Sequence, residues 1–238
     1  MERQMPENRD TVRVTRSKDE AKSFYDRISV VYDLVSGMSE RKFVQAGLGM
    51  LDVRPGEDVL EIGFGTGGGL VALADAVGDD GTVAGIDISS GMSKVAESRL
   101  EKSGEAPRVE LTLGDATSLP YDSETLDAIF MSFTLELFDV PELPIVLAEC
   151  SRTLRHDGRI CVVSMSNGGK HGLMTKAYLW AHRRLPRYVD CRPIYARSCL
   201  ERAGLEIVDD SLMSMWRLPV EIVLARKVVE ARQAESHV

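Results

Sequence analysis

A glycine-rich loop between a short apolar run and a helical segment is the feature that most constrains this chain. Residues 58–62 read Asp-Val-Leu-Glu-Ile, and residues 63–69 continue as Gly-Phe-Gly-Thr-Gly-Gly-Gly. Short apolar runs that enter a tight turn are typical of buried parallel strands. Glycines at such a turn let a ligand approach the backbone, and the N–H groups of the following helix face that ligand. The loop therefore predicts a nucleotide-binding edge on an α/β sheet.

The rest of the chain alternates between strand-like and helical segments. We expect strands over residues 58–62, 82–88, 108–113, 125–132 and 159–165. Helices are expected over residues 70–77, over 91–103 before Gly104, and after Asp139, the last one ending at Gly158. Such alternation predicts a parallel sheet covered on both faces, which is a doubly wound, Rossmann-like α/β fold.

The end of the chain departs from this alternation. A helix is expected over residues 195–203, and two strands follow over 205–213 and 218–225. These strands are too close in sequence for a helical crossover, so they must form a hairpin and at least one of them must run antiparallel to the others. The whole chain reads as one domain, residues 1–238. Its expected parts are a helical cap (1–52), a cofactor-binding core (53–166), a helical substrate lid after the fifth strand (167–194), a C-terminal helix and hairpin (195–226) and a tail (227–238).

Charge and composition exclude several classes of protein. The 238 residues carry 29 Lys+Arg and 37 Asp+Glu, a formal net charge of −8, which disfavours an overall basic nucleic-acid binder. No apolar run approaches the roughly 18 residues of a membrane span, and the charged first twenty residues do not resemble a signal peptide, so a cytoplasmic location is expected. The four cysteines and four histidines lack metal-ligand spacing, so no metal site is expected. Cys191 and Cys199 are the candidates for surface thiols.

The glycine loop fits two ligand-binding patterns. Gly63, Gly65 and Gly68 match the dinucleotide fingerprint G-x-G-x-x-G, whereas Glu61 with Gly63, Gly65 and Gly67 matches the E-x-G-x-G-x-G loop of S-adenosylmethionine binders. A carboxylate just before the first glycine would lie close to a pyrophosphate, but it is favourable beside a cationic ligand. The charge of Glu61 therefore favours S-adenosylmethionine, and a dinucleotide-dependent oxidoreductase is the less favoured alternative.

Two further acidic residues follow the next strands. Asp87, at the end of the second strand, is placed to accept hydrogen bonds from ribose hydroxyls, which either ligand would offer. Asp115, after the third strand, could accept from an adenine amino group while Leu113 and Met92 flank the ring. Three acids at the carboxyl ends of three successive strands favour an adenosyl ligand.

With these residues in place, the sequence resembles the class I S-adenosylmethionine-dependent methyltransferases, and within them the ubiquinone/menaquinone-biosynthesis type. The matching blocks are FYDRISVVYD, VLEIGFGTG, GIDISSGM, GDATSLPYDSETLDAIFMSFTLELF, RTLRHDGRICVVSM and YARSCLERAGLEIV. The resemblance implies a seven-stranded sheet with the last strand antiparallel. It also implies transfer of a methyl group from S-adenosylmethionine to a small-molecule or lipid-like acceptor.

The resemblance also assigns cofactor-binding residues. It implies that the loop from Glu61 binds the methionine moiety, Asp87 the ribose and Asp115 the adenine, and that an N-terminal tyrosine closes over the methionine carboxylate. The implied set is Tyr25, Tyr32, Glu61, Gly63, Gly65, Thr66, Gly67, Asp87, Ile88, Met92, Gly114, Asp115, Ala116, Ser132 and Phe133. Residues 39–43 read Ser-Glu-Arg-Lys-Phe where quinone enzymes carry a Trp-Arg pair, which counts against a quinone acceptor.

The expected lid is rich in basic residues: Lys170, Lys176, His182, Arg183, Arg184, Arg187 and Arg192. It reads either as a solvated amphipathic cover or as a surface for an anionic or lipid-like acceptor in peripheral contact with a membrane. The candidate general bases are His171, Tyr178, Tyr188 and Glu136. No nucleic-acid partner is expected, the chain is expected to be a monomer or a homodimer, and a non-catalytic S-adenosylmethionine-binding protein remains an alternative.

Overall fold

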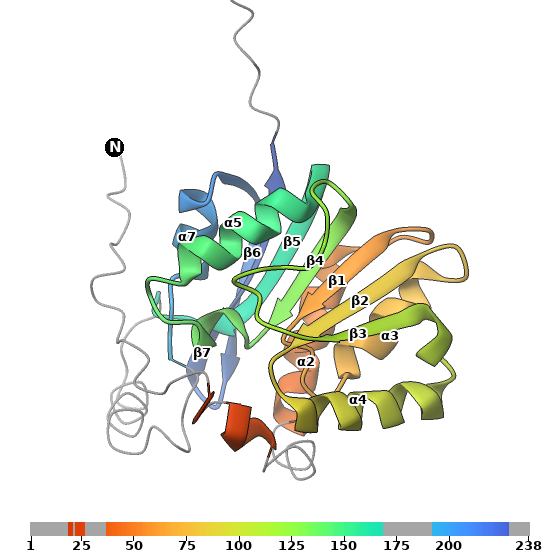
Figure 1. Cartoon of the computed structure of the whole chain (residues 1–238). Coiled ribbons are helices and arrows are strands. Elements are labelled where there is room, and N and C mark those ends of the chain that lie inside the picture. Colours follow the sequence, from red (N-terminus) through yellow and green to blue (C-terminus); the bar gives the residue numbers. More distant parts are fainter. Residues whose placement is uncertain (1–18, 21, 27–36, 169–191, 229–238) are drawn as a thin grey trace, which may run out of the picture.

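The fold is a seven-stranded sheet with helices on both faces (Figure 1). It is seen in a computed structural model of the chain, which describes residues 19–20, 22–26, 37–168 and 192–228. The strands lie in the order β3-β2-β1-β4-β5-β7-β6. Their bounds are β1 Asp58–Ile62, β2 Thr82–Asp87, β3 Val109–Leu113, β4 Leu126–Ser132, β5 Leu154–Met165, β6 Leu205–Met215 and β7 Leu218–Lys227.

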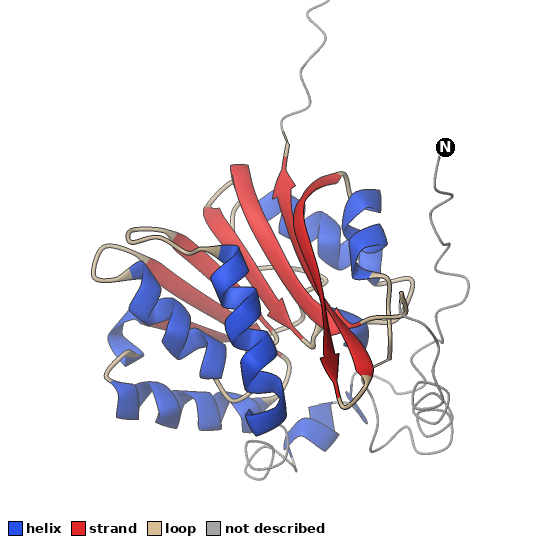
Figure 2. Ribbon diagram, turned by 180° about the vertical axis from the view of Figure 1, so that it is seen from behind, coloured by secondary structure: helices blue, strands red, loops and turns tan. Residues whose placement is uncertain are grey.

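Two groups of helices cover the sheet. Helices α2 (Gly37–Leu51), α3 (Gly68–Val77) and α4 (Ser90–Ser103) bury their apolar residues on one face, and α5 (Leu143–Thr153) and α7 (Ala196–Arg202) on the other. The same two layers are visible from behind in Figure 2. Short 3-10 turns, η2 (Ala106–Arg108) and η3 (Leu135–Leu137), precede β3 and follow β4. The predicted doubly wound α/β architecture is confirmed.

The direction of the strands also follows the prediction. β1 pairs in parallel with β2 and β4, β2 with β3, and β4 with β5, whereas β7 runs antiparallel to both β5 and β6. The β6–β7 hairpin turns at Trp216 and Arg217, whose φ angles of 50° and 69° are those of the tight turns that match strand twist. No helix in the described ranges is long and apolar enough to cross a membrane.

The predicted bounds around α5 were wrong. This helix starts at Leu143, and Asp139 lies one turn earlier, where its carbonyl oxygen accepts from the backbone N–H of Glu142 at 2.9 Å. The helix ends at Thr153 and β5 begins at once, so Gly158 lies inside the strand. The pairing with β4 jumps from Leu154 to Arg159, so residues 155–158, which were expected to belong to the end of the helix, form a bulge in β5.

Cys199 was expected at the surface, but it is only 5% exposed. It belongs to α7, which packs against α5 and β6, so its thiol faces the core. Cys191 lies outside the described residues.

Candidate functional site

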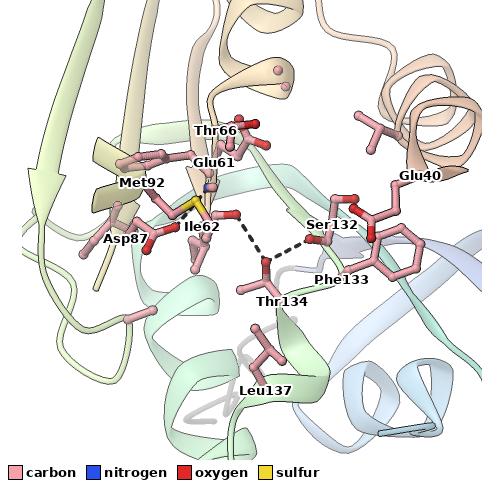
Figure 3. Close-up of a pocket in the computed structure, with 18 of the residues that line it drawn as sticks. Glu40, Glu61, Ile62, Thr66, Asp87, Met92, Ser132, Phe133, Thr134 and Leu137 are labelled. Atoms are coloured by element: carbon pink, nitrogen blue, oxygen red, sulfur yellow. Dashed lines mark hydrogen bonds between the residues drawn. The ribbon is translucent and has the colours of Figure 1, made fainter. Parts of the chain in front are cut away.

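A cavity of about 870 Å³ opens at the carboxyl ends of β1, β2 and β4. Its wall comes from the glycine loop, residues along α3 and α4, the loops after β3 and β4, and one side of α2 (Figure 3). This is the edge at which open α/β sheets bind ligands. Thirteen of the implied cofactor-binding residues line it: Tyr25, Glu61, Gly63, Gly65, Thr66, Asp87, Ile88, Met92, Gly114, Asp115, Ala116, Ser132 and Phe133.

The other two implied residues do not line the described cavity. Tyr32 lies outside the described residues. Gly67 precedes α3 with a φ of 79°, and a Cβ there would come within 2.9 Å of the Ala96 Cβ on α4. We therefore assign Gly67 to the close packing of α3 on α4. Gly65 differs, because no described atom lies within 4 Å of a Cβ built there, and a ligand can approach its backbone.

Glu61 places a buried carboxyl group beneath this loop. Its Oε2 atom is buried and has no hydrogen-bond partner among the described residues. Burial, and then the negative charge of Asp87, raise the pKa of Glu61 well above its ordinary value. Buried polar atoms without a partner are rare and need an explanation, and a ligand that supplies the missing partner is one.

Asp87 is held rigidly at the end of β2. Its Oδ1 accepts from the backbone N–H of Ser89 at 2.9 Å, and its Oδ2 accepts from that of Gly65 at 3.0 Å. Burial raises the pKa of Asp87 even though these hydrogen bonds act in the opposite direction. One carboxylate thus fixes both the glycine loop and the turn that leads into α4.

The turn after β3 forms the next part of the wall. Gly114 donates its backbone N–H to the Asp87 carbonyl oxygen at 2.9 Å, and the Asp115 carboxylate accepts from the backbone N–H of Thr117 at 2.9 Å. Met92 is buried at the start of α4 and also lines the cavity. The expectation that Leu113 flanks a bound ring is wrong, because this side chain is 53% exposed and lies outside the described lining.

The loop after β4 closes the far end of the cavity. Phe133 has a φ of 50°, which is strained for a bulky side chain, and its ring packs edge-on against Phe43 with 6.2 Å between centroids. Thr134 donates its hydroxyl to the Ser132 carbonyl oxygen at 2.9 Å. The Ser132 hydroxyl is itself buried, with no partner within the described chain. Strain of this kind at a cavity wall is common at functional sites.

One side of α2 contributes residues that the motifs did not indicate. Glu40 points toward Ser132 and Phe133 (Figure 3), and Val44 and Leu48 follow it along the same side. The spacing 40, 44, 48 is a helical stripe, so periodicity alone could have marked it. Other lining residues that were not foreseen include Arg41, Gln45, Arg99, Thr134, Leu137, Asp139 and Glu142.

Glu136 and Arg192 lie in the core, away from the places predicted for them. Glu136, a candidate base, is fully buried outside the described lining, and its Oε1 accepts from the backbone N–H of Met165 at 3.0 Å. Burial raises its pKa to about 8. Arg192 was expected on a basic surface, but it is 1% exposed and donates from Nε to the Glu136 carbonyl oxygen at 3.0 Å and from its guanidinium to that of Phe138. It therefore ties the chain before α7 to the turn η3.

The other predicted acceptor-side residues fall outside the described ranges: His171, Tyr178, Tyr188, Lys170, Lys176, His182, Arg183, Arg184 and Arg187. Within those ranges, no three His, Cys, Asp or Glu side chains gather as a metal site would require.

The sequence of this chain is similar to those of known methyltransferases. Residues 59–158 match the profile of a family described as a methyltransferase domain. The demethylmenaquinone methyltransferase of Bacillus mycoides (strain KBAB4) is 32% identical over 191 residues, covering 80% of this chain and 78% of that protein. The nocamycin O-methyltransferase of Saccharothrix syringae is 35% identical over 136 residues, covering 57% of this chain and 48% of that protein.

Solved structures share the fold at lower identity. A SAM-dependent methyltransferase from Aquifex aeolicus superposes with a TM-score of 0.63 at 21% identity, covering 85% of this chain and 98% of that one. The [4+2]-cyclase SpnF superposes with a TM-score of 0.70 at 17% identity, covering 90% and 98%. At these sequence identities the superpositions show a shared fold and nothing more.

Proposed function

Because the chain belongs to the class I S-adenosylmethionine-dependent methyltransferases, we propose that its cavity binds S-adenosylmethionine through the residues described above and presents the methyl group to a small organic acceptor. The observation that carries this proposal is the buried, unpartnered Oε2 of Glu61 in the described cavity wall. A carboxyl group in that position suits a ligand with an ammonium and a sulfonium, and it would oppose a pyrophosphate.

The remaining wall suits the other parts of the same cofactor. Asp87 has acceptor oxygens fixed at the end of β2, which fits the two donor hydroxyls of a ribose. Asp115 and the apolar side chains of Ile88, Met92 and Ala116 suit a flat base with one amino group. Gly65 leaves its backbone open at the point where the methionine end would lie.

When bound, S-adenosylmethionine supplies an electrophilic methyl group on a sulfonium. The chain's task is to hold the acceptor atom in line with that carbon at about 3–3.5 Å and to exclude water. Ser132, Phe133 and Glu40 lie together in the cavity wall (Figure 3). We assign them to orienting the acceptor, with the Ser132 hydroxyl as a hydrogen-bonding group that the described chain leaves unpartnered.

We propose a small molecule as the acceptor. Two proteins similar to this chain are named for demethylmenaquinone and nocamycin, and the cavity volume of about 870 Å³ lies in the upper part of the roughly 300–1,000 Å³ that small-molecule sites span. The Ser-Glu-Arg-Lys-Phe stretch at residues 39–43 departs from the Trp-Arg pattern of quinone enzymes, so we do not assign a quinone.

Calorimetry with purified protein tests the cofactor assignment. We expect binding of S-adenosylmethionine and of its demethylated product, and none of NAD. Binding of NAD without S-adenosylmethionine would instead support an oxidoreductase. A second assay follows formation of the demethylated product over a panel of phenols, enols, amines and thiols. Tight cofactor binding with no turnover on any acceptor would favour the non-catalytic alternative.

A further inference from the structure

Asp26, near the N-terminus, is bonded to the start of a helix more than sixty residues away. Its Oδ1 accepts from the backbone N–H of Gly91 and from the hydroxyl of Ser89, each at 2.7 Å. The Ser90 hydroxyl lies 3.4 Å from both carboxylate oxygens. An acidic side chain at the first turn of a helix satisfies free N–H groups and complements the helix dipole. Asp26 thus supplies to α4 a second cap from outside the helix.

The turn that Asp26 holds is also held by Asp87. Ser89 accepts from the backbone N–H of Met92 through its hydroxyl, as the helix's own cap, while its backbone N–H donates to Asp87. The negative charge of Asp26 is one of the causes that raise the pKa of Asp87. Burial on its own would raise the pKa of Asp26, but the hydrogen bonds from Gly91 and Ser89, the positive charge of Lys22 and the Ser90 hydroxyl together lower it. The carboxylates of Asp26 and Asp87 therefore both accept hydrogen bonds from this one turn.

The residue next to Asp26 reaches the cavity. Tyr25 lines it, and its ring packs edge-on against Phe24 with 5.5 Å between centroids. Because Asp26 is fixed to α4, the position of Tyr25 relative to the glycine loop depends on this contact. Figure 1 shows the short helical segment that carries these residues (red) beside the start of α4.

We propose that Asp26 is a positioning residue for the cofactor site, which docks the N-terminal segment on α4 and thereby holds Tyr25 at the cavity and Ser89 against Asp87. This rests on the proposed function, since it takes the cavity to be the cofactor site. Asp26 is not among the described residues that line the cavity, so we assign it no direct contact with the cofactor. Its effect passes through Tyr25 on one side and through the turn at Ser89 on the other.

The test compares Asp26→Ala and Asp26→Asn with the unchanged protein and with Asp19→Ala. Asp19 is an exposed acid of the same helical segment and forms no hydrogen bond or ion pair with the described residues, so it serves as the matched control for charge. Calorimetry with S-adenosylmethionine measures affinity, and hydrogen exchange followed by mass spectrometry measures protection of residues 19–26 and 89–93. We expect Asp26→Ala to bind about tenfold more weakly, the scale of a lost helix cap, and to exchange faster in both peptides. Asp26→Asn retains an acceptor oxygen for Gly91, so its effects are expected to be intermediate, and Asp19→Ala is expected to match the unchanged protein.

Two results would overturn the proposal: unchanged affinity and exchange in Asp26→Ala, or an equal loss of affinity in Asp19→Ala. Thermal unfolding without cofactor identifies a variant that does not fold. If Asp26→Ala fails in that way, the isosteric Asp26→Asn decides by the same two measurements. If the unchanged protein binds no S-adenosylmethionine, the proposed function fails, whereas the exchange data still report whether Asp26 docks the segment.

Discussion

The carboxyl group of Glu61 occupies the space that a side chain on Gly69 would need. A Cβ built on Gly69 would overlap Glu61 Oε1 and lie 2.7 Å from its Cδ. Gly69 is buried in the first turn of α3, so a side chain there would have to displace the Glu61 carboxyl group. Glu61, which lies before the first glycine of the loop, therefore requires a glycine at position 69, the last residue of the loop.

We expect Gly69→Ala to displace Glu61 and to weaken S-adenosylmethionine binding at least tenfold. Overpacking of a buried site should also lower the free energy of unfolding by about 1–3 kcal/mol. Gly49→Ala on α2 is the matched control, because no described atom lies within 4 Å of a Cβ there. A helical Gly→Ala change without a clash should stabilise the protein by about 0.5–1 kcal/mol. Denaturant unfolding and calorimetry check both variants, and equal affinities for the two would contradict this account.

Glu61 should also link cofactor binding to proton release. Burial and the negative charge of Asp87 raise the pKa of Glu61 well above its ordinary value, so this carboxyl group keeps its proton to a higher pH than an exposed glutamate does. A cationic ligand favours the ionised form, so binding should expel that proton and affinity should rise with pH until the free pKa is reached. Calorimetry in buffers of different ionisation enthalpy measures the proton count. We expect release by the unchanged protein and none by Glu61→Gln; identical proton counts for the two would contradict the assignment.

Asp87 should be the strongest single determinant of cofactor affinity. Hydrogen bonds to charged groups contribute about 1.5–3 kcal/mol, so Asp87→Ala should weaken S-adenosylmethionine binding by roughly ten- to a hundredfold. The variant also releases the Gly65 and Ser89 N–H groups, which should loosen the loop. Asp80→Ala, an exposed acid before β2, is the control and should bind as the unchanged protein does. Unaltered affinity of Asp87→Ala in calorimetry would refute the placement of the ribose.

The strands of the sheet could be predicted from the sequence because each strand of the core is a short apolar run bounded by turn residues. The run Asp58–Ile62 is apolar and bounded by turn residues, and its observed bounds are the expected ones. The error at Gly158 has a physical cause: β5 starts directly after α5 and accommodates the turn as a bulge, held by ion pairs of Arg155 with Asp58 and Asp127. Those partners lie far away in sequence, and a single local pattern does not contain them.

Local motifs predicted only those parts of the cavity wall that directly follow strands in the sequence. The glycine loop, Asp87 and Asp115 lie directly after strands, so their convergence follows from the parallel sheet. Glu40 comes to the site through the packing of α2 against β4 and β5, which no motif encodes. Arg192 was predicted as a surface charge because it follows a basic stretch. Its guanidinium is buried because it donates hydrogen bonds to two backbone carbonyl groups in the segment after β4.

Glu136 should make stability depend on pH. Its pKa is raised from 4.5 to about 8 by burial, so between these values the folded protein keeps a proton that the unfolded chain releases. The stabilisation that comes from this bound proton is therefore complete below pH 4.5. As the pH rises toward 8 it is lost, and the free energy of unfolding falls by up to about 1.4 kcal/mol per pH unit. We expect the free energy of unfolding of Glu136→Gln, which stays neutral, to fall less steeply over this interval.

The comparison is made by denaturant unfolding at pH 5, 6, 7 and 8, with Glu101→Gln as the control, since Glu101 is an exposed acid on α4. Glu136→Gln should gain stability relative to the unchanged protein as the pH rises, while Glu101→Gln should run parallel to it. The Met165 N–H can still donate to the retained amide oxygen, so the difference reports the charge. Parallel curves for all three proteins would mean that Glu136 ionises in the folded state near its ordinary pKa, with water or a cation reaching its Oε2.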